Sequence, residues 1–318
     1  MNLKILVITP IEHLKQTFEL MKTFDYIYKP YLNKNELIEI LKSDKSINAL
    51  FTNPNKQGFI LDKEVFINSN IKIINTASTG TNHIDKVYCE NNNIKIYSLT
   101  KDYDLINQLT STSELAFGLM ISLLRKIPFS FDSVKNYEWN YEKYIGRQVK
   151  DFNLGVIGYG RLGKMMVHYG LAFGMNVYVY DPYQKVEIEN VNQVNLNELL
   201  NNSDVVSLHV HVTDETRKMV NKDFIDKMKN NSYLINTSRG ELVDELEILK
   251  NLENGKLDGY GTDVIADEFN DIRQSKLIEC SKNEKYNIVI TPHIGGMTYE
   301  GQNKAFYHAM NKFFNLIS

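Results

Sequence analysis

Three polar residues follow consecutive predicted strands in the second half of the chain, and their side chains suit acid–base chemistry at a carbonyl group. Arg239, Glu268 and His293 each lie just beyond such a strand, on the side of a parallel sheet where ligands bind. A guanidinium can hold a carboxylate through two hydrogen bonds and polarise a neighbouring carbonyl. A carboxylate beside an imidazole favours the imidazolium and makes it a proton donor. With a hydride donor, these groups predict the reduction of a ketone.

Each of these residues also has an ordinary structural interpretation. Arg239 could form a surface ion pair with Glu241 or Asp244. Glu268 lies in an acidic stretch and could simply be solvated, and His293 could stabilise a turn. Their joint placement beyond successive strands, downstream of a nucleotide-binding motif, favours the catalytic interpretation.

A glycine-rich turn between a strand and a helix supplies that motif. The apolar strand 154–157 leads into the run Gly158-Tyr159-Gly160-Arg161-Leu162-Gly163, and a helical pattern follows. The first glycine permits a sharp turn, the second lets a pyrophosphate approach the backbone, and the third lets the helix pack on the sheet. The N-terminus of that helix points unpaired N–H groups at the phosphates. The alternative is a tight strand-to-helix turn that binds nothing.

An acidic residue at the end of the next strand indicates which dinucleotide binds. Asp181 lies eighteen residues beyond Gly163, about where a ribose-binding acid belongs. Its carboxylate would accept hydrogen bonds from both ribose hydroxyls and repel a 2′-phosphate, so the sequence favours NAD over NADP. Lys185 lies nearby and leaves NADP open.

Short apolar runs alternate with helical patterns along the chain, which is typical of parallel α/β structure. The first strand-to-helix turn, residues 9–12, has no glycine, so the first hundred residues predict a different domain. A long helix over 105–125 would bridge two domains, and the last helix, 301–317, would return to the first. We expect the substrate to meet the cofactor in a cleft between the domains. The predicted strands are 4–8, 49–52, 72–75 and 95–97, followed by 154–157, 176–180, 205–209, 233–236, 259–263 and 288–291.

Length, charge and cysteine usage exclude several classes of protein. The 318 residues allow two domains, and the net charge of −3 provides no basic surface for nucleic acid or membrane. The longest apolar stretch, Leu115–Leu124, is about half of a membrane span, and the N-terminal residues read as a strand rather than a signal peptide. Cys89 and Cys280 show no paired spacing, so we expect a reduced, cytoplasmic setting. We predict no metal site.

Over nearly its full length, the sequence resembles the D-isomer-specific 2-hydroxyacid dehydrogenases, with a phosphoglycerate dehydrogenase-like branch among the possibilities. The resemblance implies an α/β fold with two doubly wound parallel-sheet domains, in which a Rossmann NAD-binding domain is inserted in a flavodoxin-like substrate domain. The implied substrate domain comprises residues 1–102 and 297–318, and the dinucleotide-binding domain comprises 103–296. The motifs that carry the resemblance are Gly158 to Gly163, Asp181-Pro182, Leu208-His209, Asn236-Thr237-Ser238-Arg239-Gly240, Asp263 to Glu268 and Pro292-His293-Ile294-Gly295-Gly296.

The resemblance also implies a role for each matching residue in the interconversion of a D-2-hydroxy acid and its 2-oxo acid. His293 would be the acid/base, Glu268 would orient it, and Arg239 would bind the substrate. Thr79 and Gly80 resemble a loop whose N–H groups receive the substrate carboxylate, and Asn53 could face the same cleft. The implied NAD-binding residues are Gly158, Gly160, Arg161, Leu162, Gly163, Asp181, His209, Thr112, Thr237, Asp263 and Gly295.

Several questions about the substrate and the role stay open. Phe269 stands where the family usually has proline, and Lys56 is a weak candidate for binding a phosphate of the substrate. A bulky hydroxy acid from specialised metabolism is possible as well. The main alternative is an NAD(H)-sensing interaction module, like the corepressor relatives of the family, with little turnover. The resemblance also implies a homodimer built around the long middle helix and the region of Trp139.

Overall fold

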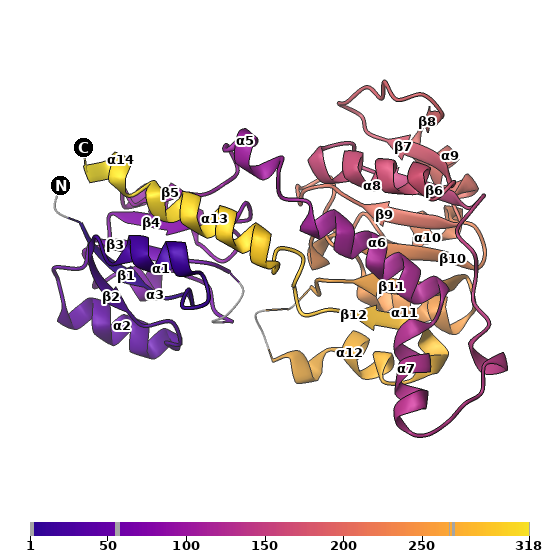
Figure 1. Ribbon diagram of the computed structural model, residues 1–318, viewed down its shortest axis with the longest axis horizontal. Coiled ribbons are helices and arrows are strands. Elements are labelled where there is room, and N and C mark those ends of the chain that lie inside the picture. The colour runs from indigo at the N-terminus through magenta and orange to yellow at the C-terminus, as the bar shows by residue number, and fades with distance from the viewer. Residues whose placement is uncertain (1–2, 55–57, 267, 269–270, 318) are drawn as a thin grey trace. The chain divides into compact units, whose positions relative to one another are not determined.

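The computed structural model describes residues 3–54, 58–266, 268 and 271–317, and the chain divides into two compact units (Figure 1). The first unit comprises Met1–Leu109 and Gly296–Ser318, and the second comprises Thr110–Gly295. Both units are α/β structures with a parallel sheet, which confirms the predicted fold class. Lys56 and Phe269, for which the sequence raises questions about the substrate, lie outside the described residues.

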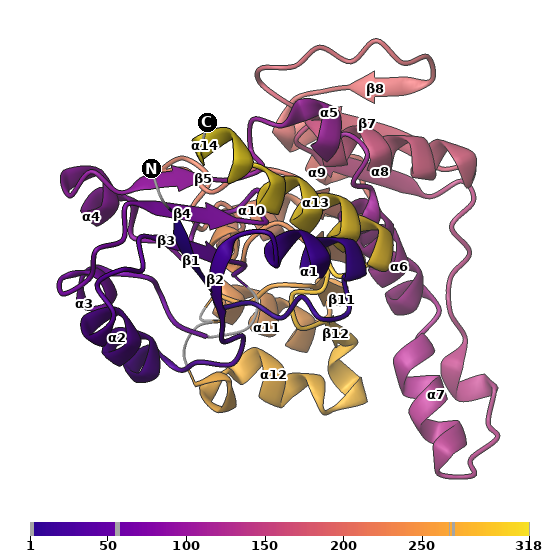
Figure 2. The same ribbon diagram turned by 60° about the vertical axis from the view of Figure 1, so that its left-hand side comes forward.

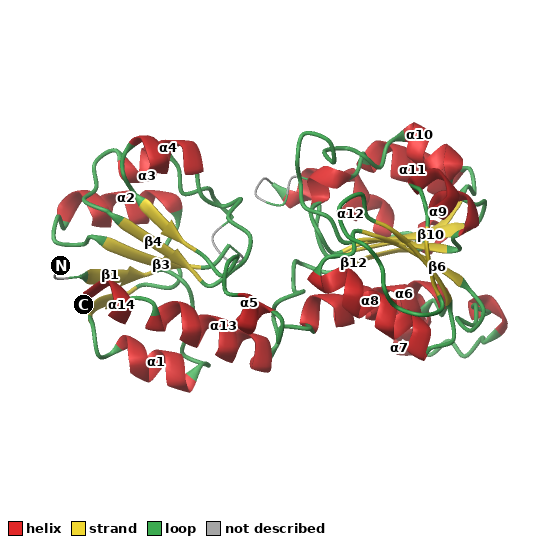
Figure 3. Ribbon diagram, turned by 90° about the horizontal axis from the view of Figure 1, so that it is seen from above, coloured by secondary structure: helices red, strands yellow, loops and turns green. Residues whose placement is uncertain are grey.

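The first unit is a five-stranded parallel sheet in the order β2-β1-β3-β4-β5, which is the flavodoxin-like order. Figure 3 shows helices on both faces of this sheet. Strands β1 and β3 lie inside the sheet and are almost wholly apolar and buried, as expected when both faces are covered. The strands are β1 (Lys4–Val7), β2 (Asp25–Tyr28), β3 (Ala49–Thr52), β4 (Ile73–Thr76) and β5 (Lys95–Tyr97). The helices are α1 (Lys15–Met21), α2 (Lys34–Ser43), α3 (Lys63–Phe66), α4 (Lys86–Asn91), α5 (Tyr103–Ile106), α13 (Tyr299–Asn311) and α14 (Phe314–Ile317).

Helix α13 returns to the first unit from the far end of the chain, as predicted. It lies beside α1 (Figure 2), and its apolar residues Phe306 and Met310 join the core formed with β1 and β3. The buried amide of Asn75 on β4 donates to the carbonyl of Ala309, 2.6 Å away. The predicted single helix over 301–317 is wrong, because the chain turns at Lys312 and restarts as α14.

The second unit is a seven-stranded parallel sheet in the order β12-β11-β10-β9-β6-β7-β8. The chain begins this sheet at β6 in the middle and builds outward on both sides, which is the Rossmann arrangement. The strands are β6 (Asn153–Ile157), β7 (Asn176–Tyr180), β8 (Val191–Gln193), β9 (Val205–Leu208), β10 (Ser232–Asn236), β11 (Leu257–Thr262) and β12 (Ile288–Ile290). The helices are α6 (Ser111–Leu124), α7 (Ile127–Lys135), α8 (Arg161–Ala172), α9 (Leu196–Asn202), α10 (Lys222–Lys227), α11 (Glu245–Glu253) and α12 (Lys276–Ser281), with 3₁₀ turns at Glu142–Tyr144, Gly240–Leu242, Ile272–Gln274 and Glu284–Tyr286.

Three details of the predicted elements are wrong. The continuous helix over 105–125 is two helices, α5 and α6, separated by residues 107–110. Strands β2 and β8 were not predicted. Both are edge strands with few fully buried residues, so they lack the apolar run that marks an interior strand.

Candidate active site

The glycine-rich turn joins β6 to α8, and two of its glycines are fixed by close backbone contacts. Gly158 has a φ of +94°, and a Cβ added there would lie 2.5 Å from the carbonyl oxygen of His209. A Cβ on Gly163 would lie 1.9 Å from the carbonyl oxygen of Gly158. Side chains are therefore excluded at both positions.

The middle glycine of this turn faces open space instead. A Cβ on Gly160 would find nothing within 4 Å. Gly160 is also the N-cap of α8, and a glycine has no side chain that could accept a hydrogen bond from the first N–H groups of that helix. Burial lowers the pKa of the neighbouring Arg161 guanidinium, so a nearby anion would offset a cost of desolvation. An accessible helix N-terminus of this kind suits a pyrophosphate.

Asp181, directly beyond β7, is held by backbone N–H groups from the glycine-rich turn and from the residues that follow Asp181 itself. It accepts hydrogen bonds from Tyr159 (2.7 Å), Tyr183 (2.8 Å) and Gln184 (2.9 Å). A carboxylate can accept about four hydrogen bonds, so capacity for a further donor remains. The bond to Tyr159 also ties the end of β7 to the glycine-rich turn.

Two buried polar atoms at the ends of β9 and β10 have no hydrogen-bond partner among the described residues. They are Nδ1 of His209 and the hydroxyl of Thr237. The other ring nitrogen of His209 lies 2.9 Å from the hydroxyl of Ser207, and burial lowers the pKa of His209 to about 4. The imidazole is therefore neutral near pH 7. Unpaired buried polar atoms are costly, and these two fit a polar ligand beside the glycine-rich turn.

His293 and Glu268 lie in contact, as the sequence predicts for a carboxylate beside an imidazole. Nδ1 of His293 lies 2.9 Å from Oε2 of Glu268, and the two side chains are 26% and 17% exposed. This bond leaves Nε2 as the nitrogen that can exchange a proton with a ligand. His293 itself has a φ of +54°, an uncommon conformation for a residue other than glycine.

The carboxylate of Asp263, at the end of β11, holds the turn that contains His293. It accepts from the Thr291 hydroxyl (2.6 Å) and from the N–H groups of Ile294 (2.8 Å) and Gly295 (2.7 Å). Its own backbone oxygen accepts from the N–H of His293 at 2.9 Å. Asp263 is only 1% exposed, and burial raises the pKa of its carboxyl group against the opposing effect of these bonds. The left-handed backbone of His293 is thus fixed from a neighbouring strand.

Arg239 begins the 3₁₀ turn after β10 and makes no ion pair with Glu241 or Asp244 among the described residues. Its guanidinium donates to the carbonyl of Ser238, while Asp244 instead caps α11 and pairs with Lys218. The surface-pair interpretation of Arg239 is therefore wrong. Strands β10, β11 and β12 are neighbours, so Arg239, Glu268 and His293 follow three adjacent strands.

Gly240, from the motif that contains Arg239, and Glu245 support the segment leading to Glu268. A Cβ on Gly240 would lie 2.1 Å from the carbonyl carbon of Ile265, so the Arg239 turn packs directly on this segment. The carboxylate of Glu245 accepts from the N–H of Ala266 at 2.8 Å. Neither contact is visible in the sequence, since each joins loops that are far apart along the chain.

Two further predicted residues of the second unit, Thr112 and Gly295, contact each other or Asp263 and so support the turn that contains His293. The hydroxyl of Thr112 donates to the carbonyl of Gly295 at 3.1 Å. Gly295 has little free space, because an added Cβ would lie 3.0 Å from the Asp263 carboxylate. The carbonyl of Leu162 accepts from the Ser113 hydroxyl at 2.9 Å, which ties α6 to the start of α8.

In the first unit, the loop after β4 presents backbone N–H groups. The carbonyl of Thr79 accepts from the Thr100 hydroxyl (2.8 Å), and that of Gly80 accepts from the Ser78 hydroxyl (2.7 Å). The N–H groups of Thr79 and Gly80 make no hydrogen bond to a described residue. Asn53, after β3, lies beside this loop and donates to the carbonyl of Ala77 at 3.4 Å. The loop therefore suits a carboxylate.

Two findings bear on other classes of site. Among the residues that the structure describes, no group of His, Cys, Asp and Glu side chains is arranged to hold a metal ion. Within the same residues, every helix is too short or too polar to cross a bilayer.

The chain is similar in sequence and fold to several known proteins. The hydroxypyruvate reductase of Thermotoga maritima is 34% identical over 247 residues, which is 77% of each chain. A D-3-phosphoglycerate dehydrogenase of Bacillus subtilis is 32% identical over 237 residues, and this match spans 74% of the chain but only 43% of that protein. The solved D-lactate dehydrogenase of Aquifex aeolicus, complexed with NAD and lactic acid, has a TM-score of 0.77 at 27% identity and covers 99% of this chain and 95% of its own.

The family comparison covers more than half of the chain. Residues 117–295 match the family described as "D-isomer specific 2-hydroxyacid dehydrogenase, NAD binding domain". This range contains the glycine-rich turn, Asp181 and the His293–Glu268 pair. The chain is therefore a member of the D-isomer-specific 2-hydroxyacid dehydrogenases, a family of NAD-dependent oxidoreductases.

Proposed function

We propose that this protein interconverts a D-2-hydroxy acid and its 2-oxo acid with NAD(H), and that His293 is the acid/base. The contact of 2.9 Å between His293 and Glu268 carries the proposal. We assign dinucleotide binding to residues 103–296 and substrate binding to residues 1–102 and 297–318. The division of the chain into Met1–Leu109 with Gly296–Ser318 and Thr110–Gly295 supports this assignment.

His293 donates a proton from Nε2 to the carbonyl oxygen of the 2-oxo acid, while its Nδ1–H stays bonded to Glu268. The carboxylate stabilises the charged ring and fixes its orientation. In the reverse direction, the neutral ring accepts the hydroxyl proton at the same nitrogen. When bound, the nicotinamide supplies or accepts the hydride at the carbonyl carbon.

Arg239 binds the substrate through its carboxylate and carbonyl oxygens, with the planar geometry that suits two parallel hydrogen bonds. Thr79 and Gly80 receive the substrate carboxylate on their N–H groups, and Asn53 lies beside this loop. The N–H groups that make no bond to described residues support this role.

The residues of the glycine-rich turn fit the pyrophosphate of NAD. Gly158, Gly160, Arg161, Leu162 and Gly163 surround it. Asp181 accepts from the adenosine ribose and disfavours NADP. Around the nicotinamide, His209 and Thr237 offer their unpaired polar atoms, and Thr112, Asp263 and Gly295 form the supporting wall.

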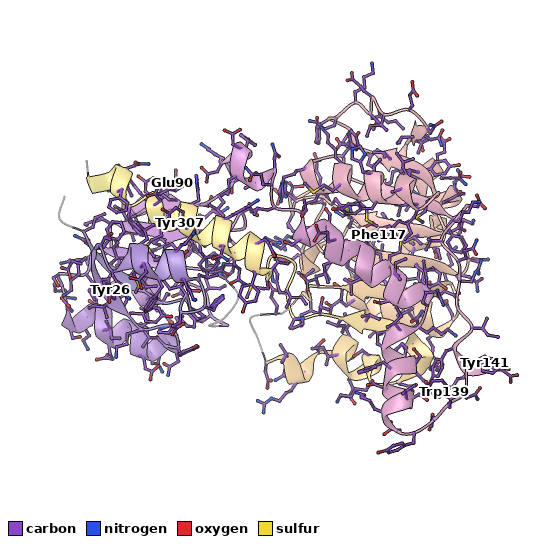
Figure 4. All side chains as sticks on the ribbon, viewed as in Figure 1. Tyr26, Glu90, Phe117, Trp139, Tyr141 and Tyr307 are labelled. Atoms are coloured by element: carbon purple, nitrogen blue, oxygen red, sulfur yellow. The ribbon has the colours of Figure 1, made fainter. Side chains whose placement is uncertain are left out.

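We further propose that the protein is a cytoplasmic homodimer. Tyr137, Trp139 and Tyr141, in the segment after α7, are at least 80% exposed. Figure 4 shows Trp139 and Tyr141 on this segment, with their side chains directed away from the unit. Exposed aromatic groups of this size favour an interface. The two cysteines form no disulfide, which suits a reducing compartment.

A steady-state assay with purified protein tests the catalytic proposal. NADH oxidation is followed with glyoxylate, pyruvate, hydroxypyruvate, 3-phosphohydroxypyruvate and bulky aliphatic 2-oxo acids, for the wild type, His293→Ala and Arg239→Ala. Turnover with one group of acids, lost in both variants, supports the dehydrogenase proposal. The acids that are turned over then show whether the substrate is of the phosphoglycerate type or a bulky specialised acid. Tight NADH binding without turnover on any acid would instead favour the NAD(H)-sensing module.

A further inference from the structure

The first unit contains a pocket of about 590 Å³ at the carboxyl edge of its sheet. Its wall is built from segments that follow β2, β1 and β3 and from the first turns of α13. All of these segments belong to the first unit. The lining residues that matter here are Glu12, His13, Tyr31, Asn53, Gln302 and Phe306.

The strand order places this pocket beside the proposed carboxylate loop. Strands β2, β1, β3 and β4 are consecutive neighbours, and Thr79 and Gly80 follow β4. Neighbouring strands are about 4.8 Å apart, so the end of β1 lies roughly 10 Å from the end of β4. A substrate whose carboxylate binds at Thr79 reaches Glu12, beyond β1, only through a side chain several bonds long.

Glu12 is a carboxylate held in place by its own neighbours. The hydroxyl of Tyr28 donates to Glu12 and accepts from the N–H of Ile11 at 3.0 Å. Burial and the bond to Glu12 both raise the pKa of Tyr28, so its phenol remains a donor. A carboxylate fixed in this way acts as a hydrogen-bond acceptor toward the pocket.

The rest of the wall suits the aliphatic part of such a side chain. Tyr31 and Phe306 contribute aromatic surface, and Nε2 of His13 is bonded to Oε1 of Gln302 at 2.6 Å. That bond joins the segment before α1 to α13, and both residues line the pocket. The lining of the pocket therefore combines aromatic side chains with the carboxylate of Glu12.

We propose that this pocket selects a 2-oxo acid with an extended side chain that ends in a hydrogen-bond donor, an amide or a cation, bound by Glu12. The inference rests on the proposed dehydrogenase function and names its class of substrate. A methyl side chain would leave most of the pocket unfilled, and a terminal carboxylate would face Glu12 with like charge.

A matched pair of substrates tests the selectivity. 2-Oxoadipate and its terminal monoamide have the same length and differ only in a carboxylate against a carboxamide, and pyruvate serves as the short substrate. We expect kcat/KM for the amide to exceed that for 2-oxoadipate by about tenfold or more, and also to exceed that for pyruvate. Glu12→Gln should reduce the amide-to-acid ratio about tenfold, and Tyr28→Phe should reduce it less. Glu19→Gln, a charge change at an α1 residue paired with Lys22, should leave it unchanged.

Calorimetric titration of the same three acids into the protein–NADH complex separates the proposed pocket selectivity from the proposed dehydrogenase function. Turnover of pyruvate with no preference for the amide, or an amide-to-acid ratio that Glu12→Gln leaves unchanged, would overturn the pocket assignment and retain the dehydrogenase. Selective binding of the amide, lost in Glu12→Gln but without oxidation of NADH, would support the pocket and overturn the dehydrogenase.

Discussion

Replacing Asp263 with Asn should impair catalysis by releasing the turn that contains His293. The carboxylate accepts from Thr291 and Ile294 on one oxygen and from Gly295 on the other. An amide keeps the most bonds by placing its oxygen toward Thr291 and Ile294, so that its NH₂ group faces the N–H of Gly295. One charge-assisted bond is then lost, and two donors oppose each other in a buried place.

The size of the effect follows from these contacts. A hydrogen bond to a charged group contributes about 1.5–3 kcal/mol, and a buried unpaired donor costs a similar amount. Part of this loss is offset, because the amide no longer has to bury a charge. We expect a net destabilisation of about 2 kcal/mol, which lowers the Tm by roughly 4–8 °C for a unit of this size. Displacement of the imidazole by about 1 Å would lower kcat about 100-fold.

Three measurements on Asp263→Asn and on Thr291→Val test this account. They are the Tm, the Kd for NADH and kcat with the best 2-oxo acid. Thr291→Val removes one of the three bonds and leaves the charge, so it should lower Tm and kcat in the same direction by less. A fall of tenfold or more in NADH affinity in Asp263→Asn, with kcat and Tm unchanged, would refute the reasoning. Asp263 would then act on the cofactor directly rather than on the turn.

Three further predictions concern other parts of the second unit. Gly163→Ala should abolish NADH binding and lower the Tm, because its Cβ would lie 1.9 Å from a carbonyl oxygen. Gly255→Ala, at a positive-φ glycine with open space, is the control that should still bind NADH. Normal NADH affinity in Gly163→Ala would contradict the expectation. Burial lowers the pKa of His209 to about 4, from about 6.5 in the unfolded chain. Between these two pH values only the unfolded chain takes up the proton, so the free energy of unfolding should fall by up to about 3 kcal/mol as the pH drops from about 6.5 to about 4. Urea titrations from pH 7 to 4 should show that His209→Gln removes this part of the pH dependence of the free energy of unfolding, and an unchanged pH dependence would contradict the burial argument. Light scattering should give a dimer mass for the wild type and a weaker dimer for Trp139→Ser, and a wild-type monomer at micromolar concentration would exclude the proposed assembly.

The sequence predicted the α/β fold and the interior strands because these strands are continuous apolar runs between helical patterns. It did not predict β2 or β8, since an edge strand buries little and carries no such run. At the candidate site, residue type and position predicted the glycine-rich turn and the pairing of His293 with Glu268, which lie 2.9 Å apart. The support from Glu245 and the fixed carboxylate of Glu12 were missed, because each depends on a partner brought close only by the fold.

The order of the two units along the chain has a consequence for synthesis on the ribosome. The second unit is one continuous segment and can fold as soon as it has emerged. The first unit needs α13, whose residues Phe306 and Met310 complete its core, and 186 residues (110 to 295) separate its two parts. At about 5–20 residues per second, the partial core of β1 and β3 waits roughly 10–40 s for its last helix. During that interval its apolar surface is a target for chaperones, and a nascent chain stalled before residue 299 should be the species they hold.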